Sequence, residues 1–167
     1  VSHDFWRTFR KTVKEEKADC ILIGENWHDA NAYLHGDEFD GIMNYAFTKA
    51  CLDFYAFDKF SPKQMSDKLN EILMRNTDTV NLMMLNLLDS HDTDRFLTRV
   101  KGDKDKLMSA IALNYFFVGT PCIYYGTEIA MEGGYDPDNR RCMDWVKAEE
   151  DTPLKKLIKT LTALKSS

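Results

Sequence analysis

Several features that mark specialised classes of protein are missing from this sequence. No apolar run approaches the roughly 20 residues of a membrane-spanning helix, and no stretch has the pattern of a signal peptide. The basic residues form no stripe and the net charge is -5, which argues against nucleic acid or an anionic membrane as the main partner. The four cysteines lack CxxC spacing, so neither a zinc site nor a redox pair is indicated. We expect free, mostly buried thiols, no cofactor and a cytoplasmic location.

The sequence does contain enough apolar material for one ordinary domain, because 44% of its 167 residues are hydrophobic. Apolar residues recur at helical spacing in some stretches and form short continuous runs in others. The helical spacing predicts helices over residues 4–17, from 61 onward, over 103–118 and from 152 onward. The short runs predict strands over residues 20–24, 39–45, 80–88 and 121–125.

Strands that alternate with helices predict βα units and a parallel sheet, so the expected fold class is α/β. Apolar strands such as residues 20–24 are expected to be buried on both faces of that sheet. The predicted strands are half the number needed for an eight-stranded barrel. Barrel enzymes carry their active sites at the C-terminal ends of the strands, so the residues that follow each strand are the candidates for function.

Three polar clusters follow predicted strands. Residues 24–30 place Glu25 at a strand end, where a partly desolvated carboxyl group is suited to donate a proton. Residues 89–95 gather acids with His91 and Arg95; the arginine is expected to pair with a neighbouring carboxylate, and the histidine to donate a hydrogen bond to a substrate hydroxyl. The third cluster covers the loops within residues 119–141. A plainer interpretation, of solvated turns with local ion pairs, remains open for each cluster.

Aromatic residues near the strand ends point to a class of substrate. Aromatic faces suit the C–H surfaces of sugar rings, although most of these residues are expected to pack in the core. Trp27 is the aromatic residue that we expect to face a ligand.

Four ordered segments together resemble a known family. They are residues 25–30 (ENWHDA), 36–45 (GDEFDGIMNY), 86–95 (NLLDSHDTDR) and 119–128 (GTPCIYYGTE). These segments resemble the α-amylase family of glycoside hydrolases, in particular its neopullulanases, cyclomaltodextrinases and maltogenic amylases. The resemblance covers nearly the whole chain, and the set of motifs is more specific than any one of them. It implies a parallel-stranded TIM-type barrel, of which residues 1–167 are the C-terminal half, with strands 5–8 and their helices.

The resemblance implies roles for individual residues on the catalytic side. Glu25 matches the family's general acid/base. Asp92 matches the third carboxylate, which binds the sugar ring and stabilises the transition state. His91 matches the histidine that hydrogen-bonds the sugar in the −1 subsite, and Trp27 resembles an aromatic residue that stacks on the leaving side of the scissile bond. These roles belong to a retaining mechanism on α-1,4 or α-1,6 bonds of cyclodextrins, pullulan or maltooligosaccharides, in which no metal takes part.

Further residues are implied as walls of the binding cleft. Asp136 and Arg140 match an acid and an arginine that hold glucose units on the non-reducing side. Asn44 and Tyr45, at the end of the second predicted strand, are pocket-wall candidates. Asn26 departs from the subgroup, which usually has an aliphatic residue there, so the polarity of the +1 side is expected to differ.

The family's nucleophilic aspartate has no counterpart among these residues. By the resemblance it is expected a few residues upstream of Val1, and the first half of the barrel and a C-terminal β domain are also expected to lie outside the chain. We therefore expect the chain to be inactive alone. A half-barrel exposes two strand edges, which favours self-association.

Other functions remain open. A non-catalytic carbohydrate-binding or structural half-barrel would keep the motifs without chemistry, and an α-1,6-glucosidase or a transglucosylating relative would share them. Metal-dependent hydrolysis is a further alternative, although the spacing of its candidate ligands fits no paired metal motif. Those ligands are His28, Asp29, His35, His91 and Asp92.

Overall fold

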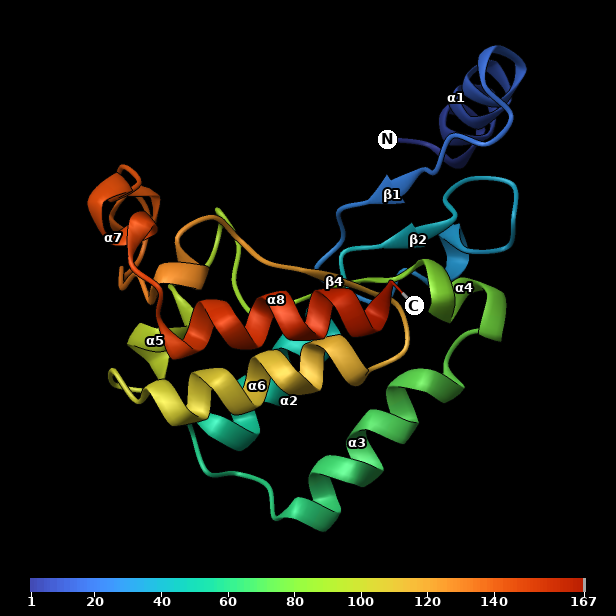
Figure 1. The fold of residues 1–167 in the computed structure, drawn as a ribbon. Helices are drawn as coiled ribbons and strands as arrows, with labels where there is room; N and C mark the ends of the chain where they lie inside the picture. Colours follow the sequence, from blue (N-terminus) through green and yellow to red (C-terminus); the bar gives the residue numbers. More distant parts are fainter. Residues whose placement is uncertain (167) are drawn as a thin grey trace.

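A computed structural model describes residues 1–166 of the chain, and in it helices alternate with short strands (Figure 1). The strands are β1 (Ile23–Gly24), β2 (Gly41–Ile42), β3 (Leu85–Leu87) and β4 (Thr120–Cys122). The α-helices are α1 (His3–Glu16), α2 (Tyr45–Tyr55), α3 (Pro62–Met74), α4 (Asp78–Met83), α5 (Phe96–Arg99), α6 (Lys104–Phe116), α7 (Trp145–Glu149) and α8 (Pro153–Lys165). The 3₁₀-helices are η1 (Asn31–Tyr33), η2 (Thr127–Ile129) and η3 (Asp138–Arg140). None of the helices within residues 1–166 has the length and apolarity to cross a membrane.

The strands form a parallel sheet in which each strand pairs with the next one along the chain. β1 pairs with β2 and β3 pairs with β4, both in parallel. A parallel bridge between Met43 and Leu85 connects the two pairs, so the order is β1-β2-β3-β4. Among residues 1–166, β1 and β4 each pair on one side only, which leaves two open edges. The predicted parallel α/β arrangement is confirmed, and its strand order is that of one part of a barrel.

Close contact between β2 and α4 requires a glycine at position 41. A Cβ atom there would lie 2.2 Å from the carbonyl oxygen of Met83, far inside van der Waals contact. Any side chain at this position would therefore push the end of α4 away from the sheet.

All four predicted helices are confirmed as α1, α3, α6 and α8, and their first turns agree with the sequence. Ser61 and Gln64 form a capping box at the start of α3, and Asp103 and Thr152 cap α6 and α8 through their side chains. These caps satisfy backbone N–H groups that have no partner within the helix.

The prediction of a strand over residues 80–88 is wrong for its first half, which belongs to α4. Thr77 accepts a hydrogen bond from the Val80 N–H, and Asp78 lies in the first turn, as favoured at a helix start. The Asn81 amide donates to the Leu73 carbonyl over 2.8 Å, which attaches α4 to the end of α3. A continuous apolar run does not by itself distinguish a helix from a strand.

Helix α2 was not predicted, and the strand before it is shorter than residues 39–45. Asn44 caps α2, and Tyr45 already belongs to the helix. Several sides of α2 are buried, so the helix has no clear polar face that would indicate its period. Its buried residues are Tyr45, Phe47, Thr48, Ala50, Cys51 and Asp53.

The expectation that residues 20–24 are buried on both faces is wrong. Ile21 is 56% exposed and Ile23 is 37% exposed, whereas Leu22 is buried. One face of β1 therefore has no covering element among residues 1–166. The cysteines also differ from expectation: all are free, but only Cys51 is buried.

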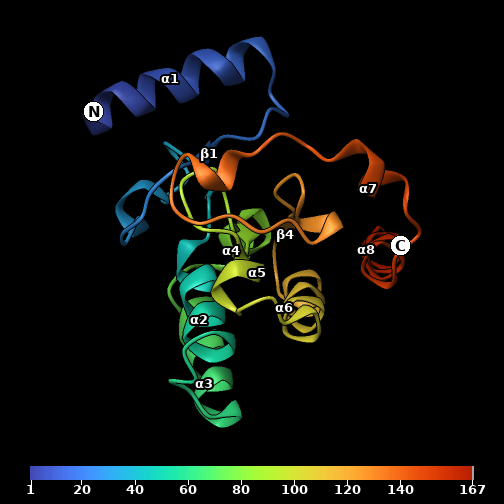
Figure 2. The same ribbon diagram turned by 90° about the vertical axis from the view of Figure 1, so that its left-hand side faces the viewer.

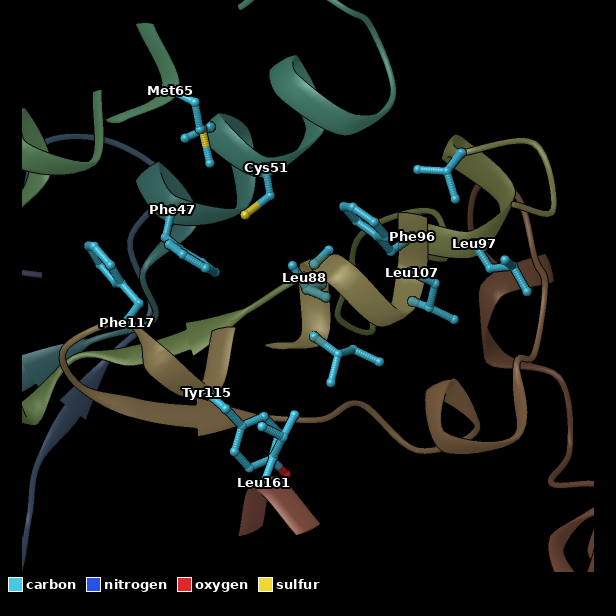
Figure 3. Close-up of a cluster of buried hydrophobic side chains, with 14 of the residues drawn as sticks. Phe47, Cys51, Met65, Leu88, Phe96, Leu97, Leu107, Tyr115, Phe117 and Leu161 are labelled. Atoms are coloured by element: carbon cyan, nitrogen blue, oxygen red, sulfur yellow. The ribbon is translucent and has the colours of Figure 1, made fainter. Parts of the chain in front are cut away.

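The main hydrophobic core lies where α2, α3, α5, α6 and α8 meet β3 (Figure 3). Phe47, Phe96, Leu107 and Ile111 are completely buried in it. Phe47 stacks on Phe117 with ring centroids 5.0 Å apart. Leu88, directly after β3, belongs to this core, and Ile123, directly after β4, packs against it.

Helix α1 lies apart from this core, at one end of the molecule in both views (Figures 1 and 2). The predicted helix is confirmed, but none of its residues is buried, and Phe5 and Phe9 are exposed. Its polar side faces the loop before β2 through ion pairs. They are His3–Glu38 at 2.7 Å, Arg7–Asp37 at 2.6 Å and Arg10–Asp40 at 2.8 Å.

Candidate active site

Three predicted site residues meet at the C-terminal ends of β1 and β3. Glu25 directly follows β1, and His91 and Asp92 lie in the loop after β3. One ligand-type atom from each side chain lies within 4.8 Å of the others, and all three residues are exposed. The carboxyl ends of parallel strands share one edge of the sheet, which explains how residues far apart in sequence converge here.

Positive and hydrogen-bonding groups surround the carboxylate of Asp92. Arg140 Nη2 lies 3.3 Å from Asp92 Oδ1, and His91 Nε2 lies 3.3 Å from Asp92 Oδ2. The Asp92 N–H donates to Ser90 Oγ over 3.2 Å. The Asp92 side chain thus lies between a guanidinium and an imidazole at the C-terminal edge of the sheet.

Arg140, which lies beside this carboxylate, also pairs with Asp136; the binding role of the two residues stays a prediction. Arg140 Nε is 3.0 Å from Asp136 Oδ1 and also donates to the His91 carbonyl over 2.9 Å. Both side chains remain close to half exposed. The pair therefore offers a fixed cation and anion to a ligand that enters next to Asp92.

Tyr45 connects the loop that carries Glu25 with the loop that carries Asp92 by hydrogen bonds. Its hydroxyl donates to Glu25 Oε1 over 3.3 Å and lies 3.2 Å from Ser90 Oγ. Burial raises the pKa of Tyr45 to about 12, so the phenol keeps its proton at neutral pH. A hydroxyl has a single proton, so Ser90 donates to Tyr45 while Tyr45 donates to Glu25. This directed series of bonds runs from the Asp92 backbone to the Glu25 carboxylate.

Trp27 is 51% exposed and stacks on Tyr45, with ring centroids 3.7 Å apart and planes at 13°. One indole face is covered by Tyr45, so a ligand has access to the other face and the edge. Asn26, next to it, accepts a hydrogen bond from the His28 N–H over 2.8 Å. The polar residue at position 26 thus closes a local turn of the loop.

Asn44 is buried, and both ends of its amide bond within the protein. Its Nδ2 donates to Asn86 Oδ1 over 2.8 Å, and its Oδ1 accepts from the Phe47 N–H. Asn86 in turn donates to the Val118 carbonyl. These bonds tie together β2, β3 and the segment before β4. The role of Asn44 as a pocket wall stays a prediction.

Two residues of the metal-hydrolysis alternative, His91 and Asp92, come together, but the other three do not join them. Within residues 1–166, the one grouping of possible metal ligands consists of Glu25, His91 and Asp92. His28, Asp29 and His35 are not members of it.

Glu25 also borders a hollow between α1 and the sheet. This cavity has a volume of about 430 Å³, and its other lining residues include Trp6, Phe9, Tyr33 and Phe39. Glu25 itself is exposed, so this hollow adjoins the residue without enclosing it.

The arrangement was compared with known proteins. The family described as alpha amylase, catalytic domain, matches residues 1–163 of the chain. The chain belongs to the α-amylase family. The cyclomaltodextrinase of Thermoanaerobacter pseudethanolicus is 44% identical over 99% of the chain and 29% of its own length. The intracellular maltogenic amylase of Bacillus subtilis is 43% identical over 99% of the chain and 28% of its own length.

A solved structure supports the same assignment. The cyclic α-maltosyl-(1→6)-maltose hydrolase of Arthrobacter globiformis superposes with a TM-score of 0.93 at 35% identity. That match covers 98% of this chain and 37% of the hydrolase. The chain thus has the fold of part of an α-amylase-family barrel and spans less than two fifths of the length of these relatives.

Arg95 of this α-amylase-family chain is completely buried, and the expectation that it pairs with a carboxylate is wrong. Its guanidinium donates to the backbone carbonyls of Asn139 and Tyr125. It also lies 4.1 Å from the ring centroid of Tyr124, at cation–π distance. Arg140, which follows in the next loop, is the arginine that pairs with Asp92.

Asn139 is the residue that sequence reasoning missed. It is completely buried, and its Nδ2 faces backbone carbonyls of the loop that carries His91 and Asp92. Its position between two charged residues of a turn-rich loop gave no signal, because contacts to backbone atoms leave no pattern in a single sequence.

Proposed function

We propose that this chain supplies the general acid/base and a transition-state-stabilising carboxylate of a retaining α-glucan hydrolase. The observation that carries the proposal is the convergence of Glu25, His91 and Asp92 within 4.8 Å at the C-terminal ends of the strands, in a chain of the α-amylase family. Its substrates would be cyclodextrins, pullulan or maltooligosaccharides, cleaved at α-1,4 or α-1,6 bonds.

In this mechanism, Glu25 protonates the glycosidic oxygen and later activates water against the covalent intermediate. Asp92 faces the oxocarbenium-like ring in its ionised form, supported by Arg140 and His91. His91 donates a hydrogen bond to a sugar hydroxyl. Tyr45 and Ser90 connect the Glu25 carboxylate to the backbone of Asp92.

The nucleophile is the part of this mechanism that we place outside the chain. Retaining enzymes hold their acid/base and nucleophile roughly 5–5.5 Å apart, and the Glu25–Asp92 spacing alone would also suit such a pair. The family resemblance instead gives Asp92 the stabilising role and puts the nucleophilic aspartate upstream of Val1. We therefore propose that the chain alone binds α-glucans without cleaving them at a useful rate.

The remaining predicted residues extend the cleft on both sides of the scissile bond. Trp27 stacks on the leaving-side sugar with its free face, beside the wall formed by Tyr45 and Asn44. Asp136 and Arg140 bond the hydroxyls of glucose units on the non-reducing side, where their mutual ion pair fixes both groups in advance.

Calorimetric titration of the purified chain with maltoheptaose, combined with chromatography of the products, tests the proposal. We expect binding without stoichiometric hydrolysis. Trp27→Ala should weaken binding about tenfold, the order expected when one ring stack is lost. Trp145→Ala is the matched control, because Trp145 is 73% exposed on α7 and outside the site.

The outcomes separate the candidate functions. Stoichiometric hydrolysis that Glu25→Gln abolishes would contradict the external nucleophile and assign that role to a residue of this chain. Binding without hydrolysis that also persists when the upstream segment is attached would favour a non-catalytic carbohydrate-binding module. No binding at all would leave a structural half-barrel.

We also propose that two copies associate through the open edges of β1 and β4. Ile23 on β1 is partly exposed, and Phe5 and Phe9 add apolar surface nearby. Sedimentation over a range of concentrations should show a concentration-dependent dimer; a monomer throughout would contradict it.

By analogy with the B. subtilis relative, whose name calls it intracellular, we propose that the protein acts in the cytoplasm.

A further inference from the structure

Asn139 lies in η3, within the loop after β4, and its side chain contacts the loop after β3. Its Nδ2 donates to the carbonyl oxygens of His91 at 2.7 Å, Thr93 at 2.8 Å and Ser90 at 3.4 Å. An amide nitrogen carries two hydrogens, so three acceptors share them. These carbonyls lie on both sides of Asp92 in the chain, which restrains the Asp92 backbone from either direction.

The turn that carries Asn139 is itself anchored. Arg95, completely buried, donates from Nε to the Asn139 carbonyl over 2.9 Å. The next residue, Arg140, donates to the His91 carbonyl over 2.9 Å. Two consecutive residues of η3 thus bond to the same carbonyl, one from inside the protein and one from the cleft.

We propose that Asn139 is a positioning residue that fixes His91 and Asp92 at the mouth of the site. The proposal deepens the function proposed above and rests on it for its catalytic meaning. Asn139 touches no substrate: it acts through the loop whose backbone it holds. Only the donor end of its amide has partners, because Asn139 Oδ1 is buried without a hydrogen bond in the described part of the chain.

Because only the donor end of the Asn139 amide has partners, Asn139→Asp is a diagnostic substitution. The two side chains have nearly the same shape, but a carboxylate turns an acceptor toward carbonyl oxygens that need a donor. The loop must then move away from η3 or take up water.

Asn114→Asp is a matched control elsewhere in the fold. Asn114 in α6 is also completely buried, and its Oδ1 also lacks a hydrogen bond among residues 1–166. Its Nδ2 donates to the Cys122 carbonyl over 3.4 Å. The control therefore reproduces the cost of a buried carboxylate without touching the loop of Asp92.

Amide hydrogen exchange in residues 90–94 is the measurement. The N–H groups of Ser90, Asp92 and Thr93 are hydrogen-bonded within this loop, so their exchange reports its opening. We expect Asn139→Asp to accelerate exchange there at least about tenfold, the effect of losing roughly one good hydrogen bond. Asn114→Asp should leave exchange in this loop unchanged. Maltoheptaose affinity, measured on the same samples, should fall in the Asn139 variant only.

Unchanged exchange in a folded Asn139→Asp variant, or an equal acceleration in Asn114→Asp, would overturn the proposal. If Asn139→Asp does not fold, Asn139→Ala removes the same donor without adding charge, and the same exchange criterion applies. The proposed function is tested separately, by maltoheptaose binding of the unsubstituted chain. If that chain binds no maltoheptaose, the proposed function is wrong, and the exchange data still decide whether Asn139 holds the loop.

Discussion

The two sides of the sheet are stabilised by different forces. Around β3, helices α2, α5, α6 and α8 bury a large apolar core. Around β1, the buried cluster consists of Ala30, Leu34 and Met84, and α1 contributes no buried residue. The amphipathic helices α1 and α8 therefore lie in opposite environments: α8 buries Leu154 and Leu161, whereas α1 buries no residue. A periodic pattern predicts a helix and its apolar face, but not whether the same chain provides the surface that covers it.

The difference is also one of energy. A completely buried Phe or Leu side chain contributes about 1.5–3 kcal/mol through the area it removes from water. Ion pairs between partly exposed side chains typically contribute about 1 kcal/mol or less. Helix α1 combines the second kind of contact with ring contacts of partly buried side chains such as Trp6 on Phe39, and its Arg7–Asp37 pair is about half exposed. Under denaturing conditions, the β1 side should therefore unfold before the core around β3.

Removing one aromatic ring from each side gives the largest expected contrast. Phe96→Ala should lower the free energy of unfolding by about 3–5 kcal/mol, because a completely buried ring leaves a cavity. Phe9→Ala, at a 41% exposed ring of α1, should cost less than about 1 kcal/mol. Urea denaturation followed by circular dichroism measures both. Similar costs at the two positions would mean that α1 is packed as tightly as the core.

A smaller contrast comes from one arginine on each side. Arg95→Met should cost about 2–3 kcal/mol, since it leaves buried carbonyls of Asn139 and Tyr125 without donors. Arg7→Met should cost clearly less than Arg95→Met, because the Arg7 side chain is 49% exposed and solvent screens its ion pair. The same denaturation assay applies. A neutral Arg95→Met variant would show that water replaces the guanidinium.

Acid should release α1 before it unfolds the core. The hydrogen bond from Arg7 lowers the pKa of Asp37. Burial raises the pKa of Asp40, but bonds from Arg10 and the Leu22 N–H outweigh burial and lower it. Carboxyl groups with lowered pKa values stabilise the folded state above their unfolded pKa of about 4, and this stability is lost as the pH falls through the folded value.

Trp6, which packs on Phe39, reports this release by fluorescence in a Trp27→Phe, Trp145→Phe background. Its emission should change between pH 5 and pH 2, in the approximate range of shifted carboxyl titrations, before the far-UV signal of the core helices is lost. Coincident transitions would contradict the idea of two separately stabilised sides.

The smallest effect is expected at the hydrogen bonds that connect the two sides. Tyr45→Phe removes the bonds from the hydroxyl to Glu25 and Ser90, and should cost about 1 kcal/mol. The stack with Trp27 should persist, because it needs only the ring. Thermal unfolding and the Trp27 emission maximum test these two statements. A shifted maximum would show that the hydroxyl also orients the indole.

Much of the candidate site was predictable, because functional residues of parallel-stranded barrels lie in the loops after the C-terminal ends of the strands. Glu25 and Asp92 were placed by the rule that parallel strands present their carboxyl ends at one edge, and Ser61, Asp103 and Thr152 marked helix starts through capping chemistry. The family resemblance rested on residues of the same loops, so both arguments point to one place.

Other features depend on contacts that no local pattern records. Helix α2 is buried on several sides, and α4 begins inside an apolar run that also suits a strand. Arg95 was expected to meet a carboxylate and instead bonds to main-chain carbonyls. Asn139 bonds to main-chain atoms too. Backbone acceptors are present at every residue, so nothing in the sequence tells which of them a side chain will reach.

The pairing of each strand with its immediate successor has a consequence for biosynthesis. No strand of the described sheet has to wait for a distant partner, because the next one is always the next to be translated. Assembly can therefore proceed vectorially as the polypeptide leaves the ribosome, with β3 and β4 joining last together with the helices that carry most of the apolar surface. A nascent chain arrested before α6 would contain the weakly packed β1 side, whereas α6 and α8, which complete the apolar core, would not yet have been synthesised.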